Sequence, residues 1–273
     1  CIRDRMTVSG FKTLTFEVAG NTYTVDNLTV SYTVRHVSQS NTFTVSPKDL
    51  DAAIVRDKDG NDVTAQFKLF AVDGLAIIKP RKVTLVSKSA EKPYDGTPLT
   101  CHVLDVQGDD FADGDRVNVT FTGSQTLVGT SDNTFTYTLH AGTKAENYNI
   151  TTEFGKLTVI DRSEENKYPI TVEANSDTKV YDGQPLVVEG FKTLTFTANG
   201  HDYTVEGLAA FAEAKDFVVD LPVNVEGEAI VRDADGNDVT AQFNITTKNG
   251  TLNITKRPAS ITSANASKEY DGK

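Results

Sequence analysis

Tryptophan is absent from this 273-residue sequence, and methionine occurs once, at Met6. No apolar run approaches the ~20 residues of a membrane-spanning helix, so we expect no membrane insertion. Basic residues are also scarce, because 27 Lys and Arg stand against 38 Asp and Glu, for a net charge of −11. Nucleic acids and anionic membranes reward clustered Lys and Arg, so the acidic balance predicts that neither is a partner.

Cysteine is nearly absent too, with only Cys1 and Cys101. A disulfide framework needs more cysteines at patterned spacing, and none is expected. The four histidines show no metal-ligand spacing, and the sequence has neither a nucleophile-elbow motif nor a Gly-rich phosphate loop. We therefore expect no cofactor, no resident metal and no enzymatic activity. Residues 1–5 resemble the translation of a transposon adaptor left in assembled metagenomic reads, and they are excluded from fold reasoning.

The sequence does contain a repeated word, Lys-x-Tyr-Asp-Gly. Its three copies include Tyr94-Asp95-Gly96, Tyr181-Asp182-Gly183 and Tyr270-Asp271-Gly272, and the first two continue to Pro98 and Pro185. The tyrosines are 181 − 94 = 87 and 270 − 181 = 89 residues apart. A period near 90 suits a small domain with its own core rather than a solenoid repeat. We expect each tyrosine to plug the core of its own domain and each Asp-Gly to make a turn.

Further words repeat across the chain. Residues 61–67 recur as residues 237–243, and residues 10–16 recur as residues 190–196. We predict a module at 6–81 that lacks its N-terminal part, a complete module at 82–161, a linker at 162–169, a complete module with a longer insert at 170–258, and the start of a further module at 259–273. Because the linker is polar and charged, we expect a hinge there.

Apolar residues alternate with period two inside each module, which is typical of half-buried strands. The expected fold is mostly β, with tandem small domains in an elongated array; each domain is β-grasp-like or, alternatively, an immunoglobulin-like sandwich. Helix signals are confined to residues 46–51 and 208–215. The stretches 32–50 and 208–225 differ most between copies, so we expect variable loops and any ligand contacts there.

Two turns resemble the start of a calcium loop because oxygen ligands occupy alternate positions. These residues are Asp57, Asp59 and Asn61 in the first module and Asp233, Asp235 and Asn237 in the third. The sixth position should be Gly but is Asp, and no Glu follows at the twelfth. The favoured interpretation is an Asx-rich hairpin turn, with a calcium site as the alternative.

Two other patterns suggest chemistry only weakly. Four carboxylates gather around Phe111, at Asp109, Asp110, Asp113 and Asp115, and paired carboxylates can perform acid–base catalysis. They flank a Gly turn, so a solvated loop is the preferred interpretation. Lys179 and Asn244 belong to opening and closing strands of one module, which leaves an internal isopeptide bond as an alternative.

Two longer words resemble a known family. Residues 92–99 and 179–186 follow Lys-x-Tyr-Asp-Gly-x-Pro-Leu, and residues 147–159 follow Asn-Tyr-x-Ile with Gly-x-Leu-x-Val. They look like the MBG-type repeats of bacterial surface adhesins, which are similar to mucin-binding repeats of Gram-positive cell-surface proteins. The resemblance implies a secreted or wall-attached, extracellular protein.

Together these observations predict a monomeric array that acts as a stalk or spacer in a bacterial adhesin and binds host glycoprotein weakly at several sites. The ligand-binding residues stay unknown. The alternative is a non-catalytic β accessory region of a secreted carbohydrate-active enzyme.

Overall fold

The structure is a computed structural model that describes residues 5–43 and 50–273. Its strands are short and numerous and form several small sheets, which confirms the expected mostly β class. The chain divides into two compact units. Unit 1 comprises residues 1–90, 100–124 and 130–157, and unit 2 comprises residues 91–99, 125–129 and 158–273. The module boundaries expected from the sequence stay predictions.

Unit 1 consists of short strands and 3₁₀ turns. Its strands are β1 (Met6–Ser9), β2 (Thr15–Val18), β3 (Asn21–Asp26), β4 (Ser31–Val34), β5 (Asn41–Phe43), β6 (Ile54–Arg56), β7 (Gly74–Ala76), β8 (Arg81–Ser87), β10 (Leu104–Gly108), β11 (Val117–Phe121), β13 (Phe135–Leu139) and β14 (Tyr148–Glu153). Its 3₁₀ turns are η1 (Val37–Gln39), η2 (Thr64–Gln66) and η3 (Ala145–Asn147). Three more strands cross the division between the units: β9 (Ala90–Pro93), β12 (Gly129–Asp132) and β15 (Lys156–Ile160). The helix expected at 46–51 falls mostly outside the described residues.

Strand β8 organises the second half of unit 1. It pairs antiparallel with β10 and parallel with β14, and the β14 register places Val83 opposite Ile150. Alternate β8 side chains, including Val83 and Leu85, point into a core with Phe135 and Tyr148. In the first half, the sheets are β2-β3-β6, β1-β4 and β5-β7. The core of that half is smaller, with Val34 and Ala76 at its centre.

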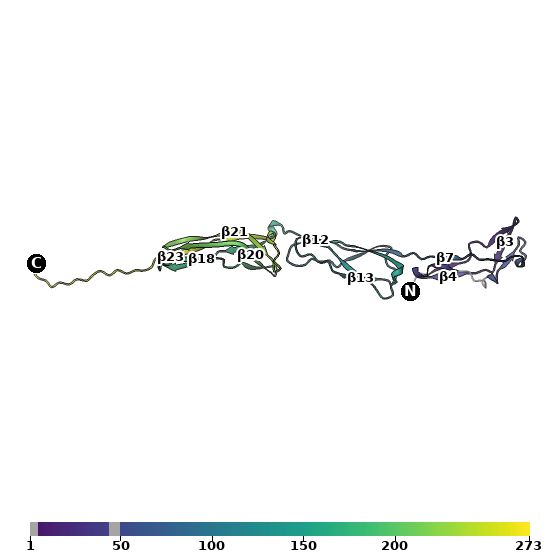
Figure 1. Ribbon diagram of the computed structural model, residues 1–273, viewed down its shortest axis with the longest axis horizontal. Coiled ribbons are helices and arrows are strands. Elements are labelled where there is room, and N and C mark those ends of the chain that lie inside the picture. The colour runs from purple at the N-terminus through teal and green to yellow at the C-terminus, as the bar shows by residue number, and fades with distance from the viewer. Residues whose placement is uncertain (1–4, 44–49) are drawn as a thin grey trace. The chain divides into compact units, whose positions relative to one another are not determined.

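Unit 2 contains the longest strands of the chain. Its elements from residue 158 onward are η4 (Glu164–Asn166), β16 (Tyr168–Glu173), β17 (Asp177–Val180), β18 (Leu186–Glu189), β19 (Thr195–Ala198), β20 (His201–Ala214), β21 (Val218–Arg232), η5 (Thr240–Gln242), β22 (Phe243–Lys248) and β23 (Gly250–Thr255). The main sheet has the order β17-β23-β21-β20-β18, with β19 also on β20, and β16 pairs parallel with β22. Figure 1 shows β20 and β21 running side by side.

The expected helix at 208–215, and the expected loop at 208–225, are wrong. Residues 208–214 form the second half of β20, and residues 218–225 form the first half of β21. Burial along this stretch has period two, which is typical of a strand. Ala210 and Ala212 point into a core with Val188 and Leu252, whereas Phe211 points outward. Strand pairing with β18 and β21 therefore overrides local propensity.

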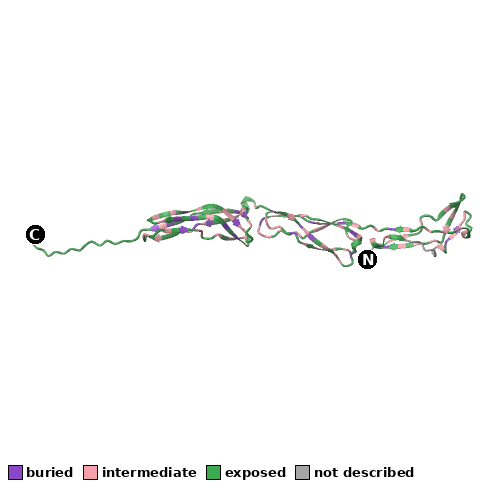
Figure 2. Cartoon of the chain, in the orientation of Figure 1, coloured by how far each residue is buried: buried purple, intermediate pink, exposed green. Residues whose placement is uncertain are grey.

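After β23 the structure describes no further strand or helix. Residues 255–273 are exposed throughout, as the green trace toward the C-terminus in Figure 2 shows. Among the described residues, no helix is both long and apolar enough to cross a membrane.

Candidate functional site: the Tyr-Asp-Gly turn and its receptors

The repeated word folds into a turn that is held by its own lysine. Lys92 Nζ donates to Asp95 Oδ1 at 2.7 Å and to the Thr97 carbonyl at 2.8 Å. The Thr97 amide also donates to Asp95 Oδ1, at 2.9 Å. Although burial pushes the pKa of Asp95 upward, these hydrogen bonds from Lys92 and Thr97 outweigh it and leave the pKa below its ordinary value. The turn is therefore a charged clasp rather than a loose loop.

The second copy repeats these bonds. Lys179 Nζ donates to Asp182 Oδ1 at 2.9 Å and to the Gln184 carbonyl at 2.6 Å. The Gln184 amide also donates a hydrogen bond to Asp182 Oδ1. The hydrogen bond from Lys179 lowers the pKa of Asp182. The third copy keeps the ion pair, with Lys268 Nζ 2.7 Å from an Asp271 oxygen. The word thus determines its own local geometry in all three places.

The tyrosine of the first copy is buried in a core that the module predicted for it shares with the next one. Tyr94 is 2% exposed and belongs to unit 2, where its hydroxyl lies 3.5 Å from that of Tyr203. It shares a hydrophobic cluster with Tyr203 and Phe243, both more than 100 residues later. Burial is the main cause that raises the pKa of both Tyr94 and Tyr203. Val159 of its own module belongs to the same cluster, so Tyr94 plugs a core shared by two predicted modules rather than the core of one.

The other two copies differ in exposure rather than in turn geometry. Tyr181 is 39% exposed and Tyr270 is 94% exposed. Each of the first two tyrosines donates its amide to the end of the neighbouring strand, Tyr94 to the Ile160 carbonyl and Tyr181 to the Thr255 carbonyl, both at 2.9 Å. The three turns share one sequence motif, so the burial of each tyrosine depends on which residues pack against it.

Side chains of Asn199, His201 and Tyr203 also pack against the backbone of the first turn, and together with Phe196 and Phe243 they are called its receptor here. A Cβ added to Gly96 would lie 2.8 Å from both the His201 ring and the Tyr203 hydroxyl, whereas one added to Gly183 would meet nothing within 4 Å. The Asn199 side chain donates to the Asp95 carbonyl at 2.8 Å. The absence of a side chain at Gly96 is thus what allows the turn to seat on β20.

The first residue of the linker predicted at 162–169 is hydrogen-bonded inside unit 2. Gln242 accepts the Arg162 amide at 3.0 Å and donates to the Asp161 carboxylate at 2.6 Å. Arg162 donates to the Tyr94 carbonyl at 2.9 Å and lies 4.1 Å from the ring centre of Tyr168. Residues 163–166 stay exposed, so the hinge expected from their charged composition stays a prediction.

The receptor around Tyr203 has a twin in unit 1. Phe196, Tyr203 and Phe243 pack with ring centres 4.9–5.8 Å apart. The twin, formed by Phe16, Tyr23 and Phe67, shows spacings of 4.9–5.6 Å and the same stacked and edge-on arrangement. Tyr203 and Phe243 are buried, but Tyr23 and Phe67 are only partly so. The same arrangement of three rings is therefore buried in unit 2 and partly exposed in unit 1.

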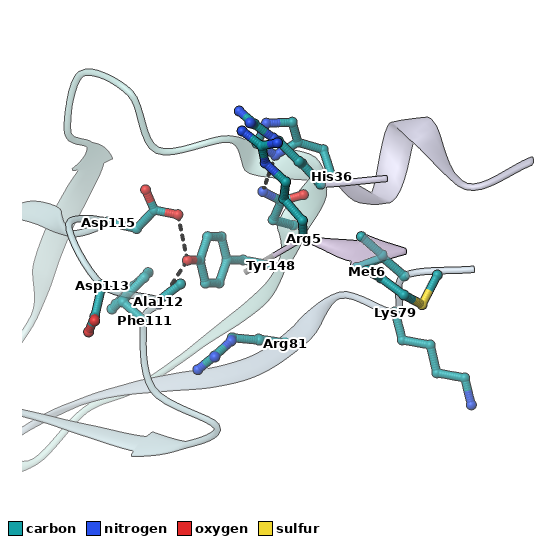
Figure 3. Close-up of a pocket in the computed structure, with 13 residues that line it drawn as sticks. Arg5, Met6, His36, Lys79, Arg81, Phe111, Ala112, Asp113, Asp115 and Tyr148 are labelled. Atoms are coloured by element: carbon teal, nitrogen blue, oxygen red, sulfur yellow. Dashed lines mark hydrogen bonds between the residues drawn. The ribbon is translucent and has the colours of Figure 1, made fainter. Parts of the chain in front are cut away.

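A groove of about 530 Å³ lies beside the middle-module residue that matches Phe243, namely Tyr148 (Figure 3). The Tyr148 hydroxyl donates to Asp115 Oδ2 at 2.7 Å and accepts the Ala112 amide at 3.0 Å. Burial, followed by the Asp115 hydrogen bond, raises the pKa of Tyr148. Lys79 and Arg81 contribute positive charge to the same groove. The rings of Phe111 and Tyr148 and the carboxylates of Asp113 and Asp115 line it as well, so the groove is aromatic and carries both signs of charge.

The two turns predicted as possible calcium loops make closed hydrogen-bond networks. Asp57 Oδ1 accepts the amides of Asp59 and Asn61, each at 2.9 Å. Asp233 Oδ1 accepts the amides of Asp235 and Asn237, at 3.0 and 2.8 Å. The hydrogen bonds from the Asn61 side chain and amide lower the pKa of Asp57. Among the described residues, no group of three or more His, Cys, Asp or Glu is placed to hold a metal ion.

The remaining predicted sites are partly occupied by structural bonds. Asp115 accepts the Tyr148 hydroxyl, and Asp109 Oδ2 accepts the Lys82 amide at 2.9 Å, so the acidic loop fastens β8 and β14. Lys179 Nζ is engaged by its own turn, while Asn244 lies on β22 opposite Pro169. Cys101 is a free thiol, and Cys1 lies outside the described residues.

Sequence reasoning missed the receptor side of the junction. Tyr203, Gln242 and Arg162 received no role, although two signals were present. The first is the matched Phe–Tyr spacing of 16 to 23 and of 196 to 203. The second is an arginine three residues after the aligned apolar residues Ile78, Val159 and Ile254, at Arg81, Arg162 and Arg257.

Residues 79–154 match the family model of the YDG domain. The match begins just before β8 and ends just after β14, so it spans most of the middle module and well under half of the chain. None of the curated proteins and solved structures compared with the chain matches it.

This match overturns the resemblance to MBG-type and mucin-binding repeats. No adhesin repeat family is matched, so the adhesin identity inferred from that resemblance is withdrawn. The error arose because the resemblance depended on short words around Tyr-Asp-Gly, and the family that is matched extends over residues 79–154.

Proposed function

We propose that this chain is a non-catalytic spacer of tandem β modules in a secreted or wall-attached protein, in which the Tyr-Asp-Gly turn of one module locks into the next. The observation that carries the proposal is the burial of Tyr94 against Tyr203 and Phe243. A spacer must transmit orientation from module to module, and a buried aromatic plug with backbone hydrogen bonds restrains bending more than a polar linker does.

The bonds around the junction support the proposal. Arg162, Gln242 and Asn199 each contribute hydrogen bonds to the turn or to the linker that follows it. The polar groups that the plug buries are therefore paired, which keeps the cost of burial low. The polar side chains of the junction are engaged in hydrogen bonds that hold the turn and the linker, and this favours a mechanical role over a catalytic one.

Small-angle X-ray scattering of the intact chain tests this proposal. The Tyr94→Ala variant should broaden the distribution of interatomic distances, because the junction loses its plug, while the circular dichroism spectrum keeps its β character. The matched variant Tyr181→Ala removes the same side chain from an exposed copy and should leave the scattering unchanged. Indistinguishable scattering from the Tyr94→Ala variant and the native chain would contradict a locking role for Tyr94.

Weak binding of a host glycoprotein, the absence of nucleic-acid partners and the accessory-region alternative stay predictions of the sequence. A glycan and glycoprotein array would test the first. The genes or domains that flank this region would distinguish a wall-anchored spacer from an accessory region beside a catalytic domain.

A further inference from the structure

The opening strand of the third predicted module, β16, is paired along one edge and open along most of the other. On its paired edge it runs parallel with β22. On the other edge a bridge joins Ala174 to Phe191, and the Lys192 amide donates to the Glu173 carbonyl at 2.9 Å. Before that bond, no strand of the described residues pairs with this edge, so residues 168–172 lack a neighbour there.

The corresponding edge of the middle module is closed by a strand. Strand β8 corresponds to β16, because Val83 precedes Tyr94 by as many residues as Ile170 precedes Tyr181: 94 − 83 and 181 − 170 both equal 11. Strand β8 pairs antiparallel with β10 through all of residues 104–108. The chain therefore contains one closed and one open version of the same edge.

The two versions begin with the same hydrogen bond. The Lys88 amide donates to the Val103 carbonyl, and the Asn175 amide donates to the Gly190 carbonyl, each at 3.0 Å. Both partners are shifted by the same amount, because 175 − 88 and 190 − 103 both equal 87. The two modules therefore share one register up to Phe191, and the difference lies in the residues that follow.

Thr193 turns the chain away from β16. Its hydroxyl accepts the Thr195 amide at 3.2 Å and donates to the Thr195 carbonyl at 2.8 Å, which makes a tight local turn. The Leu194 carbonyl accepts the Val205 amide at 2.7 Å, so the chain joins β20 and continues as β19. In the middle module the equivalent positions are residues 106–108, which stay on β8. The opening is therefore a property of residues 193–195.

A groove of about 410 Å³ lies along the open edge, between β16 and β19 and within unit 2. Its floor is apolar, with Ile170, Leu194 and Phe196 partly buried and Val205 buried. Ile170 and Phe196 also pack against the cluster that holds Tyr94. None of the residues that line the groove carries a charge. A charged side chain that entered it would lose its hydration without gaining a partner.

Backbone groups reach this groove from both sides. On β16 the Glu173 carbonyl faces the open edge, and alternate residues of a strand face the same edge, so Thr171 presents its amide and carbonyl to the groove. On β19 the backbone of Leu194 is bonded to β20, so Thr195 and Thr197 face away from β20. The backbone groups of Thr195 are already taken by the hydroxyl of its own turn. Thr171 and Thr197 are therefore the two backbone contacts that the groove offers.

We propose that this groove binds an extended, uncharged peptide segment of another protein, which adds as a strand between β16 and β19. Strand β10 is the template: it runs antiparallel to β8, so the segment runs antiparallel to β16. The residue opposite Thr171 exchanges both backbone hydrogen bonds with it. The residues opposite Val172 and Ile170 are apolar, because directly opposite side chains lie on one face and these two point toward the core.

The two open edges decide which kind of partner fits. A strand that lies between β16 and β19 needs backbone groups that are free on both of its sides. The edge strand of a folded sheet, including a sheet of a second copy of this chain, has only one free side. A segment that is unpaired before it binds meets the requirement. In this mode of recognition the backbone bonds give affinity, and the alternate side chains, which reach the apolar floor, give specificity.

Hydrogen exchange of single backbone amides, followed by NMR on the full chain, tests the open edge. Thr84 is the internal control, because it corresponds to Thr171 and pairs with Gln107 of β10. Without peptide, the Thr171 amide should exchange at least about a hundredfold faster than the Thr84 amide, because an unpaired amide needs no local opening before it exchanges. Equal protection of the two amides would overturn the proposal, since the edge would then be closed.

A dye-labelled peptide with the sequence Val-Gln-Leu-Thr-Ala, in which Gln lies opposite Thr171, is the direct probe. It should bind the full chain saturably in fluorescence polarisation and slow the exchange of the Thr171 amide. The same peptide with an N-methyl group on Gln loses one backbone donor and should bind at least about tenfold more weakly. Replacing its Leu by Asp should weaken binding to the same degree, because the groove holds no positive charge. Absence of binding, or equal binding of the native and N-methylated peptides, would contradict the addition of a strand.

Two variants of the chain complete the test. Thr171→Pro removes the amide that faces the groove, and Thr171→Val, the matched control, keeps it. Proline is tolerated where a strand amide lacks a partner, as at Pro169 on the same edge, so both variants should melt like the native chain. Thr171→Pro should bind the peptide at least about tenfold more weakly, whereas Thr171→Val should bind it like the native chain. Native affinity in Thr171→Pro would overturn the proposal.

Sedimentation velocity of the native chain separates a foreign segment from a second copy. Without peptide the chain should not self-associate through this edge. Dimers that form with rising concentration and are abolished by Thr171→Pro would assign the edge to a second copy and overturn the proposal. None of these measurements involves the Tyr94 junction, whose role as a lock is tested separately by scattering.

Discussion

The hydroxyl oxygens of Tyr94 and Tyr203 lie 3.5 Å apart inside unit 2, although 109 residues separate them in the chain. Tyr94 comes from a turn in the opening part of the middle module, and Tyr203 comes from β20. A turn that looks like local punctuation in the sequence is therefore the centre of a long-range contact. This turn should therefore contribute more to the free energy of unfolding than the same turn does elsewhere in the chain.

Replacing Tyr94 by alanine should destabilise unit 2 strongly. The change removes a fully buried ring from a packed aromatic cluster, and such truncations cost about 3–5 kcal/mol. Tyr181→Ala should cost less, about 1–2 kcal/mol, because that residue is 39% exposed whereas Tyr94 is 2% exposed. Denaturant unfolding of both variants measures the difference. Equal losses of stability would show that burial at the junction contributes nothing beyond the turn itself.

Gly96→Ala and Gly183→Ala should separate backbone strain from close packing. Both glycines have φ near +80°, at 82° and 81°, so alanine costs about 1–2 kcal/mol at either position. At Gly96 the added methyl also meets His201 and Tyr203 at 2.8 Å. Gly96→Ala should therefore lower the free energy of unfolding by more than Gly183→Ala. If the two melting temperatures fall equally, the turn does not seat against β20.

Alkaline pH should open the junction. Burial raises the pKa of Tyr94 and Tyr203 in the folded protein, whereas an unfolded tyrosine titrates near pH 10. A group whose folded pKa is raised contributes stability that is complete below the unfolded value and is lost as pH rises beyond it. The free energy of unfolding should thus be level up to about pH 9 and fall above about pH 10.

Tyr94→Phe is the control for that titration. It keeps the ring in the cluster and removes one ionisable hydroxyl, so the alkaline loss of stability should become shallower. Unfolding curves collected across the same pH range for both proteins make the comparison. A variant as sensitive to alkali as the native chain would assign the loss to other tyrosines.

Calcium should leave the stability unchanged. The carboxylates of Asp57 and Asp233 already accept backbone amides of their own turns, so binding a cation would compete with those bonds. Melting temperatures with calcium and with a chelator should coincide. Asp233→Ala should cost about 1 kcal/mol through the lost turn bonds alone. A calcium-dependent rise in melting temperature that Asp233→Ala abolishes would establish the alternative.

The sequence predicted a good part of the local structure. Period-two patterns gave strands such as β14 and β22, and repeated Asp-Gly words gave turns with positive φ at Gly96 and Gly183. The helix signal at 208–215 was wrong, because those residues pair with β18 and β21 as part of a strand. Local propensity contains no information about which neighbouring strand is available.

What the sequence by itself determined is the repeat, the mostly β class and the geometry of each Lys-x-Tyr-Asp-Gly clasp, because these depend on residues within a few positions of one another. Only the tertiary structure decided that Tyr94 is buried while Tyr181 and Tyr270 are exposed. The three copies of the motif make the same local interactions. Their tyrosines differ in exposure because an aromatic cluster, assembled from residues over 100 positions away, packs against the first turn.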